Sequence, residues 1–172
     1  MAEEMVAADI RVAKTLPSKF YYEEGLFESL LPIFSGWQFA VHDSEMNENS
    51  VIPLDHIEAI TGEPTIIVKG EKTLCLSNIC THRGMRLTAQ PCTKSILQCE
   101  YHGRTFDLNG KMKHMPEFEQ AIGFPSESDN LRKFPMHRWN GLNFVSQENE
   151  QDLSWTEIGS RFDFLDIESF VR

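Results

Sequence analysis

Basic residues are scarce in this sequence, and they never occur in runs. The chain has 172 residues, of which 16 are Lys or Arg and 26 are Asp or Glu, so its formal net charge is −10. Nucleic acid is therefore a poor candidate for a partner, because its phosphates are bound by clustered basic side chains. An acidic surface can instead attract a basic protein partner, or it can serve only to keep the chain in solution, and the charge alone does not choose between these roles.

Long apolar runs are also missing. No segment approaches the roughly 20 apolar residues that cross a membrane. The first ten residues are acidic and lack the charged-then-apolar pattern of a signal peptide. We therefore expect a cytoplasmic protein without a membrane segment. What the chain does have, 41% hydrophobic and 24% charged residues, is close to the average for soluble domains and is sufficient for a packed core.

Three zones follow one another along the chain. Residues 1–36 form an N-terminal helical segment, because apolar residues between Phe20 and Phe34 recur at helical spacing. In residues 37–150, short β-rich runs are separated by turn residues, from Ile57 onward at roughly ten-residue spacing. Residues 151–172 begin near a capping-box pattern at 154–157, which predicts a short helix. The apolar tail that follows either packs against the domain or leads into further protein, and we expect the second.

Alternating side chains and turn residues predict the strands. Trp37, Phe39 and Val41 alternate with polar or small residues and predict a first strand. Asn109-Gly110 predicts a tight hairpin, because both residues of that turn type adopt positive φ. Further strands are predicted at 65–68 and 73–77, which form a hairpin, and at 95–98, 105–108 and 142–145.

The chemistry lies in two short loops of similar composition. Cys80-Thr81-His82-Arg83-Gly84 and Cys99-Glu100-Tyr101-His102-Gly103 each supply one thiolate and one imidazole. Each loop follows a predicted strand, so both can project from one β scaffold and enclose a metal centre. The candidate ligands are Cys80, His82, Cys99 and His102.

Other interpretations of these residues compete. Two cysteines and two histidines can form a structural zinc site, although one residue between Cys80 and His82 is fewer than zinc motifs usually have. The repeated motif argues against unrelated core residues. Four cysteines can also form disulfides, which a cytoplasmic location disfavours. Cys75 and Cys92 are more simply interpreted as small buried apolar residues.

With Gly84 and Gly103 after their histidines, the paired motifs resemble those of Rieske iron–sulfur proteins. Over about residues 20–150 the chain is similar to the N-terminal domain of the α subunit of Rieske non-haem iron ring-hydroxylating oxygenases, of the phenylpropionate dioxygenase-like type. This wider resemblance includes the helical segment with Trp37 and the runs Pro53-Leu54, Gly62-Glu63-Pro64, Asn78-Ile79, Phe106-Asp107, Gly110-Lys111 and Gly141-Leu142-Asn143-Phe144-Val145.

The resemblance implies a fold and a cofactor. The fold is mainly β, a Rieske-like antiparallel barrel or sandwich with an inserted cluster-binding subdomain at about 78–106 and short terminal helices. The cofactor is a Rieske-type [2Fe–2S] cluster, with Cys80 and Cys99 on an inner iron and His82 and His102 on an outer iron nearer solvent. Two imidazoles in place of two thiolates raise the reduction potential of such a cluster.

The resemblance also implies a function, electron transfer. Electrons would arrive from a reductase or ferredoxin and leave for a mononuclear iron in an oxygenase catalytic domain or a neighbouring subunit, often in a homotrimer. A free-standing carrier of the Rieske ferredoxin type is the alternative. We expect no catalytic residue in this chain, because the four histidines outside the motifs, at 42, 56, 114 and 137, lack the close spacing of the family's mononuclear iron site. His114 and His137 are expected to be surface or loop residues.

Several positions depart from the family pattern. Thr81 and Glu100 stand where proline is common, and Arg104 stands where many oxygenases have tryptophan. We expect these residues to change packing and charge beside the cluster without contacting a ligand. Respiratory Rieske proteins join the two loops with two extra cysteines, but Met85 and Tyr101 stand at those places here. The missing bridge and the acidic surroundings predict a potential in the lower part of the roughly −150 to +300 mV range of Rieske centres.

Overall fold

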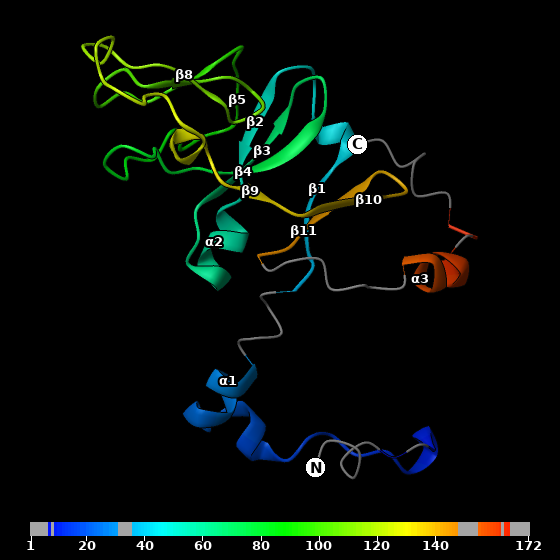
Figure 1. Cartoon of the computed structure of the whole chain (residues 1–172). Helices are drawn as coiled ribbons and strands as arrows, with labels where there is room; N and C mark the ends of the chain where they lie inside the picture. Colours follow the sequence, from blue (N-terminus) through cyan, green and yellow to red (C-terminus); the bar gives the residue numbers. More distant parts are fainter. Residues whose placement is uncertain (1–6, 8, 31–35, 148–154, 163, 166–172) are drawn as a thin grey trace. The chain divides into compact units, whose positions relative to one another are not determined.

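The computed structural model describes residues 7, 9–30, 36–147, 155–162 and 164–165 (Figure 1). The chain divides into two compact units, Met1–Ile33 and Phe34–Arg172. Among the described residues, no helix has both the length and the apolar character to cross a membrane.

The first unit contains a shorter helix than the sequence predicts. The helix α1 spans Glu24–Leu30, and the residues before it form the 3-10 turns η1 (Ile10–Val12) and η2 (Ser18–Tyr21). Tyr22 ends η2 with φ −141° and ψ −6°, which interrupts the predicted continuous helix. The apolar stripe is exposed within this unit, since Phe27 is 61% and Leu30 37% accessible. Leu31, Pro32 and Phe34 lie outside the described residues.

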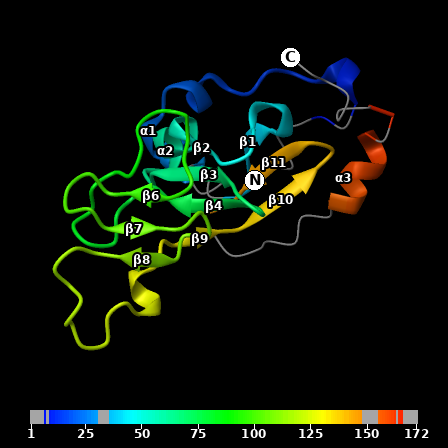
Figure 2. The same cartoon turned by 90° about the horizontal axis from the view of Figure 1, so that it is seen from above.

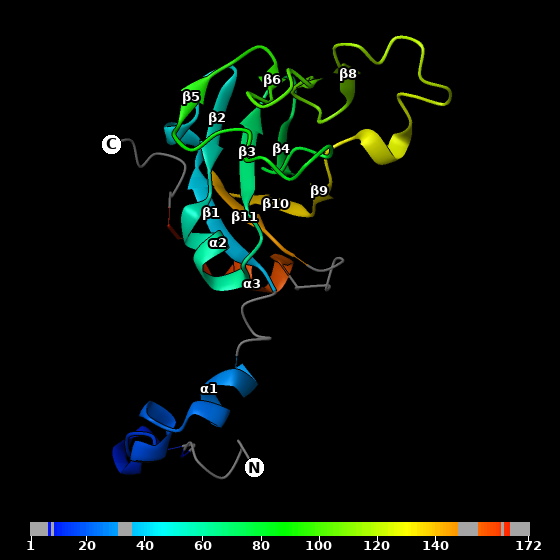
Figure 3. The same ribbon diagram turned by 90° about the vertical axis from the view of Figure 1, so that its left-hand side faces the viewer.

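The described residues of the second unit form three antiparallel sheets. One has five strands in the order β5-β2-β3-β4-β9, and the other two have three strands each, in the orders β1-β11-β10 and β6-β7-β8. Figure 3 shows β2, β3 and β4 side by side, and Figure 2 shows β6, β7 and β8 together at one end of the unit. The strands are β1 (Gln38–His42), β2 (Ser50–Pro53), β3 (Thr65–Lys69), β4 (Thr73–Ser77), β5 (Cys92–Thr93), β6 (Leu97–Gln98), β7 (Thr105–Phe106), β8 (Met112–His114), β9 (Lys133–Phe134), β10 (Met136–Trp139) and β11 (Leu142–Val145). The helical elements are η4 (Asp43–Glu45), α2 (Asp55–Thr61), η5 (Glu127–Asp129) and α3 (Trp155–Phe162).

The central strand of the five-stranded sheet, β3, is buried on both faces. Ile66 and Val68 of β3 belong to a core cluster that also contains Phe106 and both motif cysteines, Cys80 and Cys99. Ile67, between them, belongs to a second cluster with residues of β1, β11 and α2. Successive side chains of a strand point to opposite faces, so β3 separates the half of the core that supports the motif loops from the other half. The predicted mainly β, antiparallel architecture is confirmed.

One hairpin is confirmed as predicted, and a second forms with a different turn. The strands β3 and β4 pair from Thr65 opposite Ser77 to Lys69 opposite Thr73. At the Asn109-Gly110 turn only Gly110 has positive φ, +79°. The Asp107 carboxylate accepts hydrogen bonds from the amides of Asn109 and Lys111, both at 2.9 Å. The prediction of positive φ at Asn109 was wrong, because this carboxylate organises the turn.

The predicted first strand is confirmed as β1, but two features of the β zone were not predicted. Phe39 is 45% exposed whereas Ala40 and Val41 are each 5% exposed, because a register shift between Phe39 and Val41 breaks the alternation. The helix α2 occupies residues 55–61, where no helix was predicted. It begins at Leu54 without a side-chain cap and ends at Gly62 with φ +72°, so this glycine is the residue in the sequence that marks its end.

The predicted C-terminal helix is present as α3, although Ser154 of its capping box lies outside the described residues. The Phe162 ring lies 6.2 Å from that of Trp139 in β10, so the end of α3 contacts the sheet β1-β11-β10. Phe164 is 79% exposed. Residues 166–172 of the apolar tail lie outside the described residues, and the expectation that the tail leads into further protein stays a prediction.

Candidate metal centre

Both sequence motifs form loops of the same backbone geometry. The first loop leaves β4 and the second leaves β6. In the first, the amide of Cys80 donates to the carbonyl of Met85 at 2.8 Å, and in the second the amide of Cys99 donates to that of Arg104, also at 2.8 Å. Each loop therefore closes five residues after its cysteine.

The glycine at the end of each motif makes this closure possible. Gly84 and Gly103 both have φ of +72°, a conformation that glycine adopts without a steric penalty. Their amides donate to the carbonyls of Cys80 at 3.1 Å and Cys99 at 3.0 Å. At Gly103 a Cβ atom would also lie 3.2 Å from Cγ of Pro116. Both motifs thus require glycine there, although the histidine occupies a different place in each.

The four candidate ligands form two pairs at different depths. Cys80 is 2% and Cys99 3% exposed, and both belong to the core cluster. His82 is half-buried and His102 is exposed. The centroids of the two imidazole rings lie 4.9 Å apart at an interplanar angle of 69°. Thiols therefore face the interior and imidazoles face the surface.

Aromatic side chains flank the imidazole pair. The Tyr101 ring stacks on His102 with centroids 3.8 Å apart and an interplanar angle of 29°. The Phe118 ring meets His82 edge to face at 6.3 Å. Tyr101 is 56% and Phe118 37% exposed, so an apolar surface surrounds the outer end of the site.

Local electrostatics influence the protonation of these groups. Burial raises the pKa of the Cys80 thiol, and Cys99 raises it further, whereas the His82 amide and Arg104 act in the opposite direction. Desolvation lowers the pKa of His82, and the nearby charges of His102, Arg104 and Arg83 lower it further. A neutral imidazole is the form that binds metal, and a thiol that loses its proton requires a cation nearby.

The donor set fits a two-iron cluster. A Rieske [2Fe–2S] centre takes two thiolates on one iron and two imidazoles on the other, which matches a pair of buried cysteines beneath a pair of surface histidines. Among the described residues, no group of three or more His, Cys, Asp or Glu side chains is arranged to hold a single metal ion.

The remaining cysteines and histidines lie away from the loops or on other elements. All four cysteines are free. Cys75 is buried in the second core cluster, as predicted, and burial raises its pKa to about 12. Cys92 in β5 is only half-buried. His114 is exposed in β8 and is thus a surface residue as expected, whereas His137 is half-buried in the strand β10.

Asn78 supports the first loop from below, a role that sequence reasoning missed. This side chain has no exposed surface. Its Nδ2 donates to the carbonyl of Thr88 at 2.8 Å, and its Oδ1 accepts from the amide of Thr88 at 3.0 Å. Asn78 thereby ties the strand that enters the first loop to the segment that leaves it. The signal available in the sequence was a polar residue at the end of an apolar strand.

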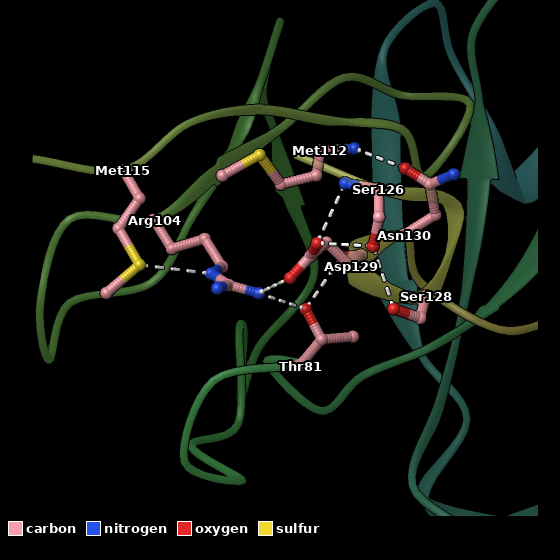
Figure 4. Close-up of polar contacts among 8 residues, drawn as sticks. All are labelled: Thr81, Arg104, Met112, Met115, Ser126, Ser128, Asp129 and Asn130. Atoms are coloured by element: carbon pink, nitrogen blue, oxygen red, sulfur yellow. Dashed lines mark hydrogen bonds and ion pairs between the residues drawn. The ribbon is translucent and has the colours of Figure 1, made fainter. Parts of the chain in front are cut away.

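A buried ion pair beside the loops was also missed. Arg104 is 4% exposed, and its Nη1 lies 3.2 Å from Oδ1 of Asp129 in η5. Figure 4 shows both residues with Thr81, whose hydroxyl accepts from Arg104 at 2.7 Å and donates to the Asp129 carbonyl at 2.7 Å. The sequence drew attention to Thr81 and Arg104 as departures from the family, but no local pattern pointed to Asp129.

Comparisons with known proteins agree with this arrangement. The model of the Rieske [2Fe-2S] domain family matches residues 36–135. The carnitine monooxygenase oxygenase subunit of Escherichia coli is 28% identical over 151 residues, which cover 84% of this chain and 39% of that protein. The chloroplastic choline monooxygenase of Amaranthus tricolor is 30% identical, with 86% and 34% covered. The biphenyl dioxygenase subunit alpha of Paraburkholderia xenovorans is 27% identical, with 66% and 25% covered.

Solved structures share the fold. A quaternary ammonium Rieske monooxygenase in complex with L-carnitine superposes with a TM-score of 0.79 at 24% identity, covering 94% of this chain and 47% of that one. Naphthalene 1,2-dioxygenase from a Rhodococcus species gives 0.74 at 24% identity, covering 88% and 36%. The chain thus spans less than half the length of these relatives. Since the family match extends over more than half of its residues, the chain belongs to the Rieske [2Fe–2S] domain family, is homologous to Rieske oxygenase subunits, and is a domain that binds a [2Fe–2S] cluster.

Proposed function

We propose that this chain transfers single electrons through a Rieske cluster held by Cys80, His82, Cys99 and His102. The observation that carries this proposal is the pairing of two buried thiols with two surface imidazoles on loops of equal backbone geometry. When bound, the cluster accepts and releases one electron at a time. The protein gives the two ends of the cluster different surroundings.

The two ends have separate tasks. Cys80 and Cys99 hold the inner iron among core side chains, which exclude water and keep both loops in place. His82 and His102 hold the outer iron at the surface, where a partner protein can come within electron-transfer distance. Tyr101 and Phe118 give that partner an apolar contact around the imidazoles.

We place this electron transfer in an oxygenase α subunit. In this proposal residues 1–36 are a helical segment, 37–150 the Rieske domain, and 151–172 the start of a connection to a catalytic domain. Electrons come from a reductase or ferredoxin and leave for a mononuclear iron in that domain or in a neighbouring subunit of a homotrimer. The chain is then part of an enzyme of the cytoplasm, a location in keeping with four cysteines that form no disulfide.

The oxygenase type is the finer part of the proposal. The matches to the carnitine and choline monooxygenases extend over 84% and 86% of this chain, against 66% for biphenyl dioxygenase. The longer sequence matches are thus to monooxygenases, which favours that type over the dioxygenase type that the family resemblance implied. The organic substrate would bind in the catalytic domain.

Metal analysis tests the cluster assignment directly. The full chain, purified without oxygen, should be red-brown, contain two iron and two sulfide per chain, and give the EPR signal of a Rieske cluster when reduced. Cys80→Ser and His102→Ala should abolish the signal, because each removes a ligand. Cys92→Ser and His114→Ala are matched controls that should keep it. A colourless protein with one zinc per chain, or a Cys80→Ser variant that retains the cluster, would overturn the proposal.

A further inference from the structure

The Arg104 guanidinium is enclosed at the base of the two cluster loops. It lies two residues after His102, and its side chain is 4% exposed, which is rare for arginine. Its Nε lies 3.4 Å from the Met115 sulfur, and its guanidinium carbon is 5.3 Å from the centre of the Phe124 ring. A charge in such surroundings persists only with fixed polar partners.

Those partners come from both sides of the site. Nη1 of Arg104 donates to Oγ1 of Thr81 at 2.7 Å and to Oδ1 of Asp129 at 3.2 Å. Thr81 is the residue between Cys80 and His82 in the first loop. The contact therefore joins the first loop to the second. The Thr81 hydroxyl in turn donates a hydrogen bond to the carbonyl of Asp129.

Asp129 is itself held in place, as Figure 4 shows. Its Oδ2 accepts from the amide of Ser126 at 2.9 Å and from the Ser126 hydroxyl at 2.8 Å, while Oδ1 is left for Arg104. The side chain of the next residue, Asn130, accepts a hydrogen bond from the amide of Met112 in β8 at 2.9 Å. The far end of the link is thus attached to the sheet that carries the second loop.

This link has two physical consequences. It constrains both loops without a covalent bond, although Met85 and Tyr101 replace the cysteines that join the loops in respiratory Rieske proteins. It also sets a positive charge, partly compensated by Asp129, beside a cluster that becomes more negative on reduction. The net charge near a cluster is one of the factors that set its potential.

Resting on the proposed function, we infer that Arg104 is a positioning residue that, with Thr81 and Asp129, cross-links the two cluster loops and raises the reduction potential of the cluster. In this role the arginine counteracts the acidic surroundings that the composition suggests.

The charge and the hydrogen bonds can be tested separately. In Arg104→Met the positive charge is lost and the negative charge of Asp129 is no longer neutralised, so the potential should fall. In Asp129→Asn the guanidinium loses its counter-charge, so the potential should rise. We expect each variant to change the ratio of reduced to oxidised protein at a fixed applied potential by roughly threefold, in opposite directions. Arg83→Met, which removes an exposed charge from the first loop, should give a smaller change because water screens that charge.

Cluster release to a chelator measures the cross-link. Thr81→Val removes the hydroxyl at nearly constant shape and should accelerate release about tenfold with little change in potential. Arg104→Lys keeps the charge but loses the forked geometry, so it should also accelerate release. The double variant Thr81→Val/Arg104→Met should accelerate release by less than the product of the two single effects, because both changes break the Arg104–Thr81 contact while only Thr81→Val also breaks the bond to the Asp129 carbonyl.

Failure of this inference is distinguishable from failure of the proposed function. If the unmodified chain binds no cluster, the proposed function is wrong. If the chain binds a cluster but Arg104→Met and Asp129→Asn shift the potential in the same direction or leave it unchanged, Arg104 has no electrostatic role. If Thr81→Val and Arg104→Met accelerate release additively, the cross-link is refuted. Arg104→Lys and Asp129→Asn keep both tests available should Arg104→Met fail to fold.

Discussion

Replacing Asn78 with leucine should loosen the first cluster loop without touching a candidate ligand. Leucine has nearly the same shape but neither donates nor accepts, so the amide and the carbonyl of Thr88 would each lose their partner. A hydrogen bond is worth about 1 kcal/mol, and a partner left unsatisfied away from water costs more, which together suggest a loss of about 2 to 4 kcal/mol. The fully buried position leaves leucine no route to solvent.

Hydrogen exchange reports this loss where it occurs. Because each 1.36 kcal/mol changes an equilibrium tenfold, amides of residues 79–88 should exchange about 30- to 900-fold faster in Asn78→Leu. Asn47→Leu makes the same chemical change at an exposed position and should leave exchange almost unchanged. If exchange in residues 79–88 rises no more in Asn78→Leu than in Asn47→Leu, Asn78 does not hold the loop.

Two further predictions concern the hydrophobic core and the Asp43 carboxylate. Phe106 has no exposed surface and packs in the cluster that contains Cys80, so Phe106→Ala should destabilise the domain by about 3–5 kcal/mol in urea unfolding, whereas Phe27→Ala, at a 61% exposed position, should change little. Partial burial raises the pKa of Asp43, but hydrogen bonds from Asn143 and Arg138 outweigh it and lower the pKa below its usual value. The resulting stabilisation is present above the ordinary carboxyl pKa of about 3.9 and is lost as the pH falls through the lowered folded value, so Asp43→Asn should flatten the acid side of the stability curve followed by circular dichroism.

The predictions that succeeded depend on short stretches of sequence. The β3–β4 hairpin was predicted from two β-rich runs around a turn, and the two strands pair along their whole length. The two loops were predicted from a cysteine, a histidine and a glycine within five residues, and the structure brings both loops together. In each case the residues that determine the geometry are neighbours in the chain.

The features that were missed depend on distant residues or on competition between local signals. Arg104 and Asp129 are 25 positions apart and meet through an irregular segment, so no periodicity connects them. The exposed Phe39 results from a register shift against β11, which only pairing with that strand reveals. The short helix α2 has no side-chain cap at its start, so its tertiary contacts, including Ile57 in the second core cluster, outweigh a weak local pattern.

Experiments on the turn at residues 107–110 can distinguish the predicted turn, with positive φ at two residues, from the observed turn, with positive φ at one. If both Asn109 and Gly110 had positive φ, alanine would be strained at either position. In the structure only Gly110 does, and a Cβ there would also lie 3.1 Å from Cδ2 of Leu76. Gly110→Ala should therefore cost about 1–2 kcal/mol, and Asp107→Ala a similar amount because two amides lose their acceptor.

Asn109→Ala is the decisive variant of this turn. Its backbone already has the negative φ that alanine prefers, so we expect a change within about 0.5 kcal/mol in urea unfolding. An Asn109→Ala cost equal to that of Gly110→Ala would show that the turn has positive φ at both residues. A small cost would mean that the Asp107 carboxylate, two residues earlier, selects the turn geometry over the preference of the Asn-Gly pair, and that a side-chain contact two residues away determines how β7 returns into β8 beside the second loop.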